Sequence, residues 1–202
     1  MPEIEYVEDR MESEELLERL CPPVRNWFKD KFPDFTEPQK VAIPRILNGE
    51  HLLLCSPTGS GKTLTAFLTI IDDLVRRSLD GSLPDAVQCV YISPIKALAN
   101  DIEKNLMGPL GEIKERYLPS RAKEIKVGLR TGDTPQSERE KMLRKPPHIL
   151  ITTPESLGLG LASKRFRPIL DQMKWFIIDE MHSLVPTKRG THLSLSMALM
   201  DS

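Results

Sequence analysis

Short hydrophobic runs alternate with helical patterns along the chain. Each run has five or six residues and is rich in Val, Ile and Leu, and a polar or proline-containing turn follows it. The runs occupy residues 51–55, 87–92, 125–130, 148–152 and 174–178. Nearly continuous apolar runs of this length are typical of strands buried on both faces. Strands that alternate with helices predict an α/β fold, namely an open parallel sheet with helices on both faces.

The turns after these runs carry helix-start signals. Residues 93–94, 134–135 and 153–154 each place a Ser or Thr before a proline. A hydroxyl oxygen accepts a hydrogen bond from the first turn of a helix, and proline suits the first helical position because it has no N–H to lose. We therefore expect helices to begin at these points. In a parallel sheet, ligands bind at the carboxyl ends of the strands.

The strongest local motif is a glycine-rich loop that follows the first hydrophobic run and opens a helical pattern. It comprises Ser56, Pro57, Thr58, Gly59, Ser60, Gly61, Lys62 and Thr63. Glycines let successive N–H groups point at phosphate oxygens, and the helix N-terminus adds partial positive charge. Lys62 would then reach the β- and γ-phosphates of a nucleotide, and the Thr63 hydroxyl would bind Mg²⁺. The consensus opens with glycine, but the Ser56 side chain is small enough to take that place. A glycine-rich turn without a ligand is the alternative.

An acidic pair follows the last hydrophobic run. Asp179 can hold Mg²⁺ through water, and Glu180 can polarise an attacking water as a general base. Because the pair ends a buried strand downstream of the glycine-rich loop, we expect it beside the bound phosphates; a surface charge pair is the alternative. Upstream, the amide of Gln39 can pair with the N6 and N7 edge of adenine, although by itself it is only a helix-start residue.

Charge is unevenly distributed, although the formal net charge is only −1. Residues 1–20 contain eight acidic and two basic side chains, which leaves the rest of the chain at a net charge of +5. Within that remainder, residues 119–145 carry eight basic and four acidic side chains. This basic segment suits the phosphates of a nucleic acid, and a merely solvated face is the alternative. The acidic leader is predicted to be a surface helix with a narrow apolar stripe, or else a flexible arm.

Composition excludes several classes of protein. Cys21, Cys55 and Cys89 lack the spacing of a metal site and cannot all pair, which favours a reducing, intracellular setting. No apolar run approaches the ~18–20 residues that span a bilayer. The acidic start also lacks the basic and apolar regions of a signal peptide. We therefore expect a cytoplasmic protein that has no membrane partner.

Seven motifs, taken together and in order, resemble the first RecA-like motor domain of a superfamily-two DExH-box helicase. Within that superfamily the chain most resembles the large-helicase-related (Lhr) group. The motifs are residues 35–39, 56–63, 92–98, 130–134, 153–157, 179–182 and 187–190. The resemblance implies a RecA-like P-loop NTPase fold and an ATP-dependent helicase or single-strand translocase. It also implies ATP and Mg²⁺ as cofactors, single-stranded or partly duplex nucleic acid as partner, and a role in DNA repair.

The resemblance assigns roles to individual residues. Catalysis falls to Lys62, Asp179 and Glu180, and Mg²⁺ binding to Thr63 and Asp179. His182 couples the nucleotide state to the rest of the motor. The residues that contact nucleotide are Gln39, Ser56, Pro57, Thr58, Gly59, Ser60, Gly61, Lys62, Thr63, Asp179, Glu180 and His182. Those that contact nucleic acid are Pro94, Lys96, Ala97, Leu98, Arg130, Thr131, Gly132, Asp133, Thr153, Pro154 and Glu155. A translocating motor suits contacts to phosphates rather than to bases.

Two parts are expected, an acidic leader over residues 1–22 and a motor domain over residues 23–202. The chain ends at Ser202 within a helical pattern, before the Ser-Ala-Thr motif and the second RecA-like domain that the resemblance implies. An arginine finger from such a domain can be worth ~10³–10⁵ in rate. We therefore expect residues 1–202 to bind ATP–Mg²⁺ weakly, to hydrolyse it slowly and not to unwind duplexes alone.

Two other functions fit part of the sequence. A small-molecule P-loop kinase would need a mobile arginine-bearing lid, for which residues 164–167 are a candidate, but it would not explain the other helicase motifs. A nucleotide-gated nucleic-acid-binding module without catalysis is the second alternative. Transfer of phosphate to a small acceptor would identify the kinase. Single-stranded DNA binding that depends on an ATP analogue would identify the module.

Overall fold

The computed structural model describes residues 5–57 and 59–200, except for the side chains of residues 96–98, 100 and 104. The chain forms two compact units. The first comprises Met1–Ser82 and Leu110–Lys123, and the second comprises Leu83–Pro109 and Glu124–Ser202. Neither unit begins or ends at residue 22, and the domain boundary predicted there stays a prediction.

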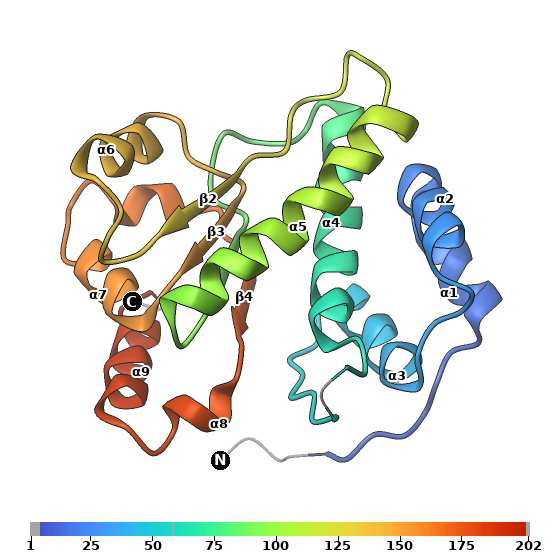
Figure 1. Ribbon diagram of the computed structural model, residues 1–202, viewed down its shortest axis with the longest axis horizontal. Helices are drawn as coiled ribbons and strands as arrows, with labels where there is room; N and C mark the ends of the chain where they lie inside the picture. The colour runs from blue at the N-terminus through green and yellow to red at the C-terminus, as the bar shows by residue number, and fades with distance from the viewer. Residues whose placement is uncertain (1–4, 58, 201–202) are drawn as a thin grey trace. The chain divides into compact units, whose positions relative to one another are not determined.

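The first unit is a group of helices around one long amphipathic helix (Figure 1). Its helices are α1 (Ser13–Arg19), α2 (Pro22–Lys31), α3 (Glu37–Leu47), α4 (Lys62–Asp80) and the end of α5 (Lys96–Tyr117). Helix α4 contacts α2 and α3, and α1 contacts α3. The apolar side of α4 is buried, since Leu68, Ile71 and Val75 are fully shielded from solvent. Helix α1 lies within the predicted acidic leader, where Leu16 is buried.

A buried carboxylate ties the start of α2 to the middle of α4. Asp72 is 1% exposed and accepts a hydrogen bond of 2.6 Å from the Cys21 backbone N–H. Its second oxygen accepts one of 2.6 Å from Arg76 Nε. Burial, together with the adjacent Asp72 charge, raises the pKa of the Cys21 thiol to about 12. A buried carboxylate is tolerated here because both of its oxygens are paired.

The second unit contains a four-stranded parallel sheet. Its strands are β1 (Cys89–Ile92), β2 (Val127–Arg130), β3 (Ile149–Thr152) and β4 (Trp175–Ile178), in the order β2-β3-β1-β4. Strand β1 aligns Cys89 with Ile149 of β3 and with Trp175 of β4. Strands β1 and β3 are wholly buried, as their continuous apolar runs predict. The expected parallel α/β fold is therefore confirmed.

Helices of the second unit begin close to the predicted points. They are the first part of α5, α6 (Gln136–Arg144), α7 (Pro154–Leu161), the 3₁₀ turn η1 (Arg167–Leu170), α8 (Met181–Leu184) and α9 (Lys188–Met200). Helix α7 starts one residue after its predicted cap, α6 two residues after and α5 three residues after. At α7 the Thr153 hydroxyl accepts the Ser156 N–H at 3.4 Å, as the capping argument predicts.

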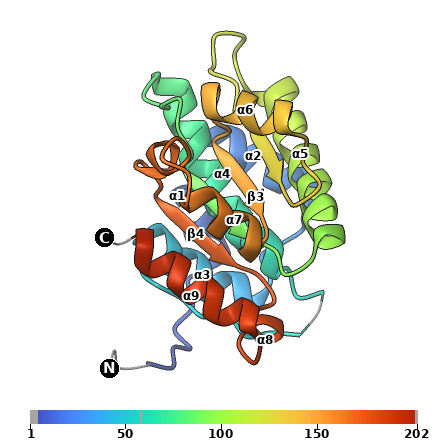
Figure 2. The ribbon, with the colours of Figure 1, turned by 90° about the vertical axis from the view of Figure 1, so that its left-hand side faces the viewer.

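One core joins the sheet to α7 and α9, which lie side by side in Figure 2. Phe166 is 1% exposed in this core, together with Leu150 of β3 and Leu157 of α7. Gly160 of α7 makes room for it, because a Cβ there would lie 2.7 Å from the Phe166 ring. A buried Phe166 does not suit the mobile lid that a small-molecule kinase would need from residues 164–167.

The first predicted strand is wrong. Residues 51–55 precede the glycine-rich loop but form no strand, and Leu53 is 68% exposed. An extended run becomes a strand only when its N–H and C=O groups pair with a neighbour, and residues 51–55 pair with no strand in the described part of the chain.

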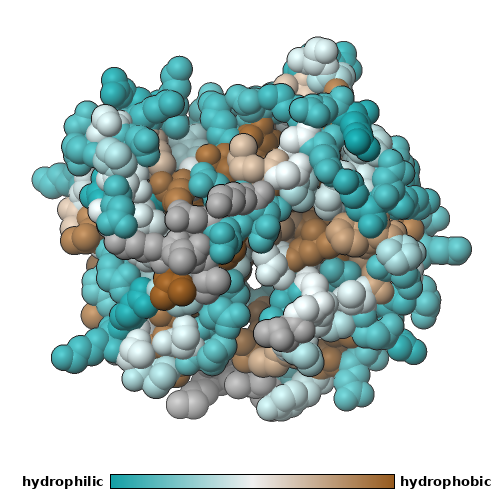
Figure 3. Space-filling view, viewed as in Figure 1, coloured by the Kyte–Doolittle hydropathy of each residue, from teal (hydrophilic) through white to brown (hydrophobic). Residues whose placement is uncertain are grey.

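Figure 3 shows a largely hydrophilic face with scattered hydrophobic patches. None of the described helices is long and apolar enough to cross a membrane.

Candidate functional site

The glycine-rich loop leads directly into α4 in the first unit. Gly61 caps the helix with φ = 86° and Gly59 has φ = 80°, left-handed conformations that side chains other than glycine rarely adopt. A Cβ on Gly61 would also lie 2.8 Å from Gln39 Nε2. The predicted turn and helix start are therefore present, and both a backbone angle and a close contact require glycine at residue 61. Thr58, also assigned to this loop, lies outside the described residues.

Lys62 is turned back onto the loop that it follows. Its Nζ atom donates to the carbonyl oxygens of Ser56, at 2.5 Å, and of Pro57, at 2.8 Å. The hydroxyls of Ser56 and Ser60 are 2.6 Å apart across the same loop. An ammonium group has three donors and can exchange carbonyl partners for phosphate oxygens. Thr63, the next residue, is exposed on the first turn of α4.

Gln39 connects the start of α3 to the glycine-rich loop. Its Oε1 accepts the Thr36 N–H at 2.9 Å, and its Nε2 donates to the Gly61 carbonyl at 3.5 Å. The Thr36 hydroxyl donates to the Ser60 carbonyl at 2.9 Å. Gln39 is therefore brought to the loop as predicted. Its amide is 2% exposed and engaged on both sides, so pairing with adenine would need a change of partners.

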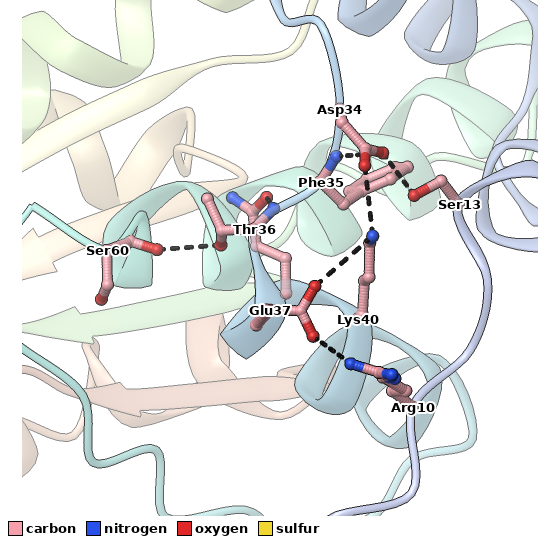
Figure 4. A network of polar contacts seen from close by, with 9 residues as sticks. Arg10, Ser13, Asp34, Phe35, Thr36, Glu37, Lys40 and Ser60 are labelled. Atoms are coloured by element: carbon pink, nitrogen blue, oxygen red, sulfur yellow. Dashed lines mark hydrogen bonds and ion pairs between the residues drawn. The ribbon is translucent and has the colours of Figure 1, made fainter.

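A network of charged side chains around α3, not predicted from the sequence, surrounds this contact (Figure 4). Lys40 Nζ lies 3.1 Å from Asp34 Oδ2 and 3.5 Å from Glu37 Oε1. The opposite oxygen of Glu37 accepts from Arg10 at 2.8 Å, and Ser13 donates to Asp34. The hydrogen bonds from Ser13 and Lys40 lower the pKa of Asp34, and the one from Arg10 lowers the pKa of Glu37. Only the tertiary fold brings the leader residues Arg10 and Ser13 here.

The acidic pair lies at the carboxyl end of β4 in the second unit. The Asp179 N–H donates to the Ile92 carbonyl of β1 at 2.9 Å. Its carboxylate accepts the Glu180 N–H at 2.9 Å on Oδ1 and the Tyr91 hydroxyl at 2.6 Å on Oδ2. Glu180 has φ = 49°, the only positive φ among the described residues other than glycine. Such strain is typical of functional positions. His182 is exposed, with Nδ1 3.3 Å from a Glu180 oxygen.

Residues 131–134 form a loop after β2 that is held by an arginine of α6. Arg139 donates to the carbonyls of Thr134 at 2.8 Å, Gly132 at 2.9 Å and Thr131 at 3.1 Å. Sequence reasoning counted Arg139 only as part of the basic segment. The signal that could have found it is its place one turn into the helix that follows the loop, because a long side chain there points back toward the N-terminus.

Arg130, at the end of β2, is buried despite its charge. It is 8% exposed, and its guanidinium lies 4.4 Å from the centre of the Phe166 ring. Burial, and the nearby charge of Arg139, lower its pKa. A stacked guanidinium keeps part of its stabilisation from the ring when water is removed. Two cations next to this loop favour an anionic ligand.

Residues 153–155 follow β3 beside this loop. Thr152 Oγ1 donates to the Arg130 carbonyl at 2.7 Å, so the ends of β2 and β3 are linked. Pro154 is buried, whereas Glu155 is exposed. Each carboxylate oxygen of Glu155 accepts a hydrogen bond from the guanidinium of Arg189 in α9. The hydrogen bond from Arg189 lowers the pKa of Glu155. The carboxylate predicted to contact nucleic acid is thus also a bridge between α7 and α9.

The strand ends therefore gather most of the predicted residues of the second unit. Pro94, after β1, is buried, and Lys96, Ala97 and Leu98 begin α5, where their side chains lie outside the described part. Because β2, β3, β1 and β4 are parallel neighbours, the residues after all four strands share one edge of the sheet. That edge is where ligands of parallel α/β sheets bind.

The oxygen donors at the two sites suit Mg²⁺. A hydroxyl from Thr63 and a carboxylate from Asp179 are hard ligands of the kind that Mg²⁺ prefers. Asp179 is half-buried, with both oxygens oriented by donors. Within residues 5–57 and 59–200, no three His, Cys, Asp or Glu side chains gather into a cluster that could hold a metal.

The profile of the DEAD/DEAH box helicase family matches residues 36–201. The chain belongs to this family. It is 48% identical to the ATP-dependent helicase Lhr-Core of Methanocaldococcus jannaschii, over all of this chain and 24% of the relative. It is 43% identical to the Lhr helicase/uracil glycosylase of Escherichia coli, over 91% of this chain and 12% of the relative. The predicted resemblance to the Lhr group is confirmed.

A solved structure supports the same assignment. The structure of Mycobacterium smegmatis helicase Lhr bound to ssDNA and AMP-PNP superposes with a TM-score of 0.82 at 44% identity. The match covers 92% of this chain and 23% of that chain. The sequence thus spans about a quarter or less of the length of these relatives. Its RecA-like fold is established by the match.

Proposed function

We propose that this chain is the ATP-binding motor domain of an ATP-dependent helicase or single-strand translocase. The observation that carries the proposal is the loop before α4, where the left-handed Gly61 caps the helix and Lys62 lies against the loop carbonyls. A glycine-rich loop with a lysine at the start of the following helix suits a triphosphate, because backbone N–H groups, an ammonium and a helix N-terminus all favour phosphate oxygens. The family match and the nucleotide analogue bound to the M. smegmatis relative support the proposal.

Each residue of the site then has a distinct task. Lys62 exchanges the Ser56 and Pro57 carbonyls for phosphate oxygens. Thr63 and Asp179 would hold Mg²⁺, which supplies charge neutralisation for the departing phosphates when bound. Glu180 orients the attacking water and takes its proton on a carboxylate oxygen. Gln39 recognises the adenine edge with the amide that now contacts Gly61 and Thr36.

We further propose that the carboxyl edge of the sheet binds the phosphates of a nucleic acid strand. The buried Arg130 and the loop held by Arg139 supply positive charge, and the cap at Thr153 supplies helix N–H groups. The ssDNA in the M. smegmatis structure supports this proposal. Partly duplex nucleic acid and a second RecA-like domain are the further partners that we propose. A role in DNA repair and a cytoplasmic location stay predictions.

A titration with a fluorescent, nonhydrolysable ATP analogue tests the nucleotide site. The chain should bind it in the presence of Mg²⁺, and Lys62→Ala should abolish binding while leaving the thermal unfolding midpoint in place. Lys29→Ala is a matched control, because Lys29 is an exposed lysine of α2 in the same unit. Unchanged affinity in Lys62→Ala would overturn the proposed phosphate loop.

The alternative of a nucleotide-gated binding module without catalysis differs only in the absence of hydrolysis. Labelled single-stranded DNA, titrated with and without the ATP analogue, distinguishes the two when combined with a phosphate-release assay. Binding gated by nucleotide with no release of phosphate would favour the module.

A further inference from the structure

A buried tyrosine reaches the carboxylate of the acidic pair. Tyr91 is the third residue of β1, is 2% exposed, and donates its hydroxyl to Asp179 Oδ2 at 2.6 Å. In the parallel register Tyr91 lies opposite Ile177 of β4. Asp179 follows the last residue of β4, two residues after Ile177, and so continues on the same face of the sheet. Such a diagonal neighbour is within reach of a long aromatic side chain.

The hydroxyl is the only polar group of the Tyr91 side chain, which is 2% exposed, and a phenyl ring would fill almost the same volume. A buried hydroxyl must find a partner, because burying it unpaired costs about 1–3 kcal/mol. Asp179 provides this partner, so the hydroxyl depends on the carboxylate as much as the carboxylate depends on it.

Two donors fix the orientation of the Asp179 carboxylate. Tyr91 occupies one oxygen and the backbone N–H of Glu180 the other, at 2.9 Å. The Glu180 N–H is in turn held in place by the left-handed backbone at that residue. Each carboxylate oxygen accepts two hydrogen bonds or ligands, so one direction on each remains open.

The chemical type of the donor matters. A lysine or arginine in this place would pair with Asp179 and cancel the charge that a cation needs. A phenol orients the carboxylate and leaves its full negative charge.

We propose that Tyr91 is a positioning residue that orients Asp179 for Mg²⁺, acting through the carboxylate without touching nucleotide or metal. This inference rests on the proposed function, in which Asp179 helps to hold the Mg²⁺ of ATP. Groups that orient a metal ligand from behind typically contribute about 10-fold or more to metal affinity. The competing explanation is that the hydrogen bond between Tyr91 and Asp179 only stabilises the fold by linking the ends of β1 and β4, and has no effect on metal binding.

The variant Tyr91→Phe removes only the hydroxyl. We measure the affinity of the 202-residue chain for a fluorescent ATP analogue in EDTA and in saturating Mg²⁺, and Mn²⁺ binding to the nucleotide complex by electron paramagnetic resonance. We expect Mn²⁺ affinity to fall about 10-fold. Affinity in EDTA should stay within about 2-fold of the unsubstituted chain, because the phenol does not touch nucleotide.

Tyr117→Phe is the matched control. The Tyr117 hydroxyl also donates to a carboxylate, that of Asp30, but in the first unit and at an exposed site. This control should lose a tyrosine–aspartate hydrogen bond without changing Mn²⁺ affinity. A purely structural tie at Tyr91 would lower the unfolding midpoint and leave the Mn²⁺ affinity of the folded protein unchanged, and that outcome overturns the proposal.

A double-substitution cycle keeps the test decisive if Tyr91→Phe also lowers stability. In the Asp179→Asn background, Tyr91→Phe should have no further effect on Mn²⁺ affinity, because the residue that transmits its influence is gone. Equal effects in both backgrounds would refute action through Asp179. If the unsubstituted chain itself shows no Mg²⁺-dependent gain in nucleotide affinity, the proposed function fails instead.

Discussion

Single residues of both sites are held by partners within the protein that a ligand would replace or share. Lys62 rests on the carbonyls of Ser56 and Pro57, and Gln39 rests on Thr36 and Gly61. These contacts satisfy polar groups that would otherwise be left unpaired in the absence of nucleotide. At this scale, function is an exchange of hydrogen bonds, so substitutions should separate binding from chemistry.

Glu180→Gln should retain nucleotide affinity and lose whatever hydrolysis the chain performs. The amide is nearly the same size as the carboxylate but cannot take a proton from water, so rates should fall by about 10²–10⁴-fold. Parallel binding titrations and single-turnover phosphate release measure the two quantities. A variant that hydrolyses ATP at the original rate would remove Glu180 from the role of base.

Gly61→Ala should weaken nucleotide binding strongly and lower stability by about 1 kcal/mol or more, because it combines a left-handed backbone with a clash. Its added Cβ would lie 2.8 Å from Gln39 Nε2. Gly59→Ala is the control, since it has φ = 80° but no atom within 4 Å of the added Cβ. Equal losses in the two variants would mean that the contact with Gln39 is unimportant.

Elements are set in place by contacts at their ends. Helix α3 is tied to the leader by the network around Lys40, and the loop after β2 is tied to α6 by Arg139. Helix α7 is joined to the functional edge through Phe166, whose ring contacts Gly160 and stacks under Arg130. Packing in α7 and charge at the edge of the sheet are therefore physically connected.

The network around α3 predicts a pH-dependent contribution to stability. Asp34 and Glu37 have lowered pKa values in the folded protein, so their contribution is present above the ordinary carboxyl pKa of about 4 and is lost as pH falls below it. The unfolding midpoint of Lys40→Gln should therefore lie below that of the unsubstituted chain at pH 7, and the gap should shrink by pH 3. Lys29→Gln should show no such gap. A gap that is constant with pH would contradict this assignment.

Helical glycines should respond in opposite directions to alanine. Gly160→Ala places a Cβ 2.7 Å from the buried Phe166 ring and should cost about 1–3 kcal/mol of unfolding free energy. Gly111→Ala, in α5, meets nothing within 4 Å and should gain about 0.5–1 kcal/mol. Urea unfolding measures both. Stabilisation by Gly160→Ala would contradict this prediction, because it would show that the Phe166 ring moves to make room for the added methyl group.

At the scale of the molecule, the chain divides into a helical unit that carries the glycine-rich loop and a sheet unit that carries the acidic pair. Each unit holds its own part of the predicted residues. Arginine fingers supplied by a second RecA-like domain, which we propose as a partner, contribute ~10³–10⁵ to the rate in P-loop enzymes. We therefore expect hydrolysis to be slow until that partner is engaged.

Phosphate release by residues 1–202 should therefore be weak and barely stimulated by single-stranded DNA. DNA binding itself should fall steeply with salt and show no sequence preference, because phosphate contacts release counterions. Single-turnover kinetics and fluorescence titrations at two salt concentrations measure these properties. Rapid hydrolysis that DNA stimulates would show that the chain needs no further domain.

The sequence by itself determined what depends on local pattern. Four apolar runs became parallel strands, hydroxyl–proline turns preceded helices, and a glycine-rich segment capped α4, because period, capping and backbone freedom are properties of neighbouring residues. The same logic failed for residues 51–55, since a strand also needs a partner that no local pattern supplies. Tyr91 against Asp179, Arg139 on its loop and Arg10 beside α3 were likewise decided only by the tertiary structure. Each of these contacts is a hydrogen bond between residues that are apart in the sequence. Such a bond depends on the distance and angle between two atoms in space, which local sequence pattern does not set.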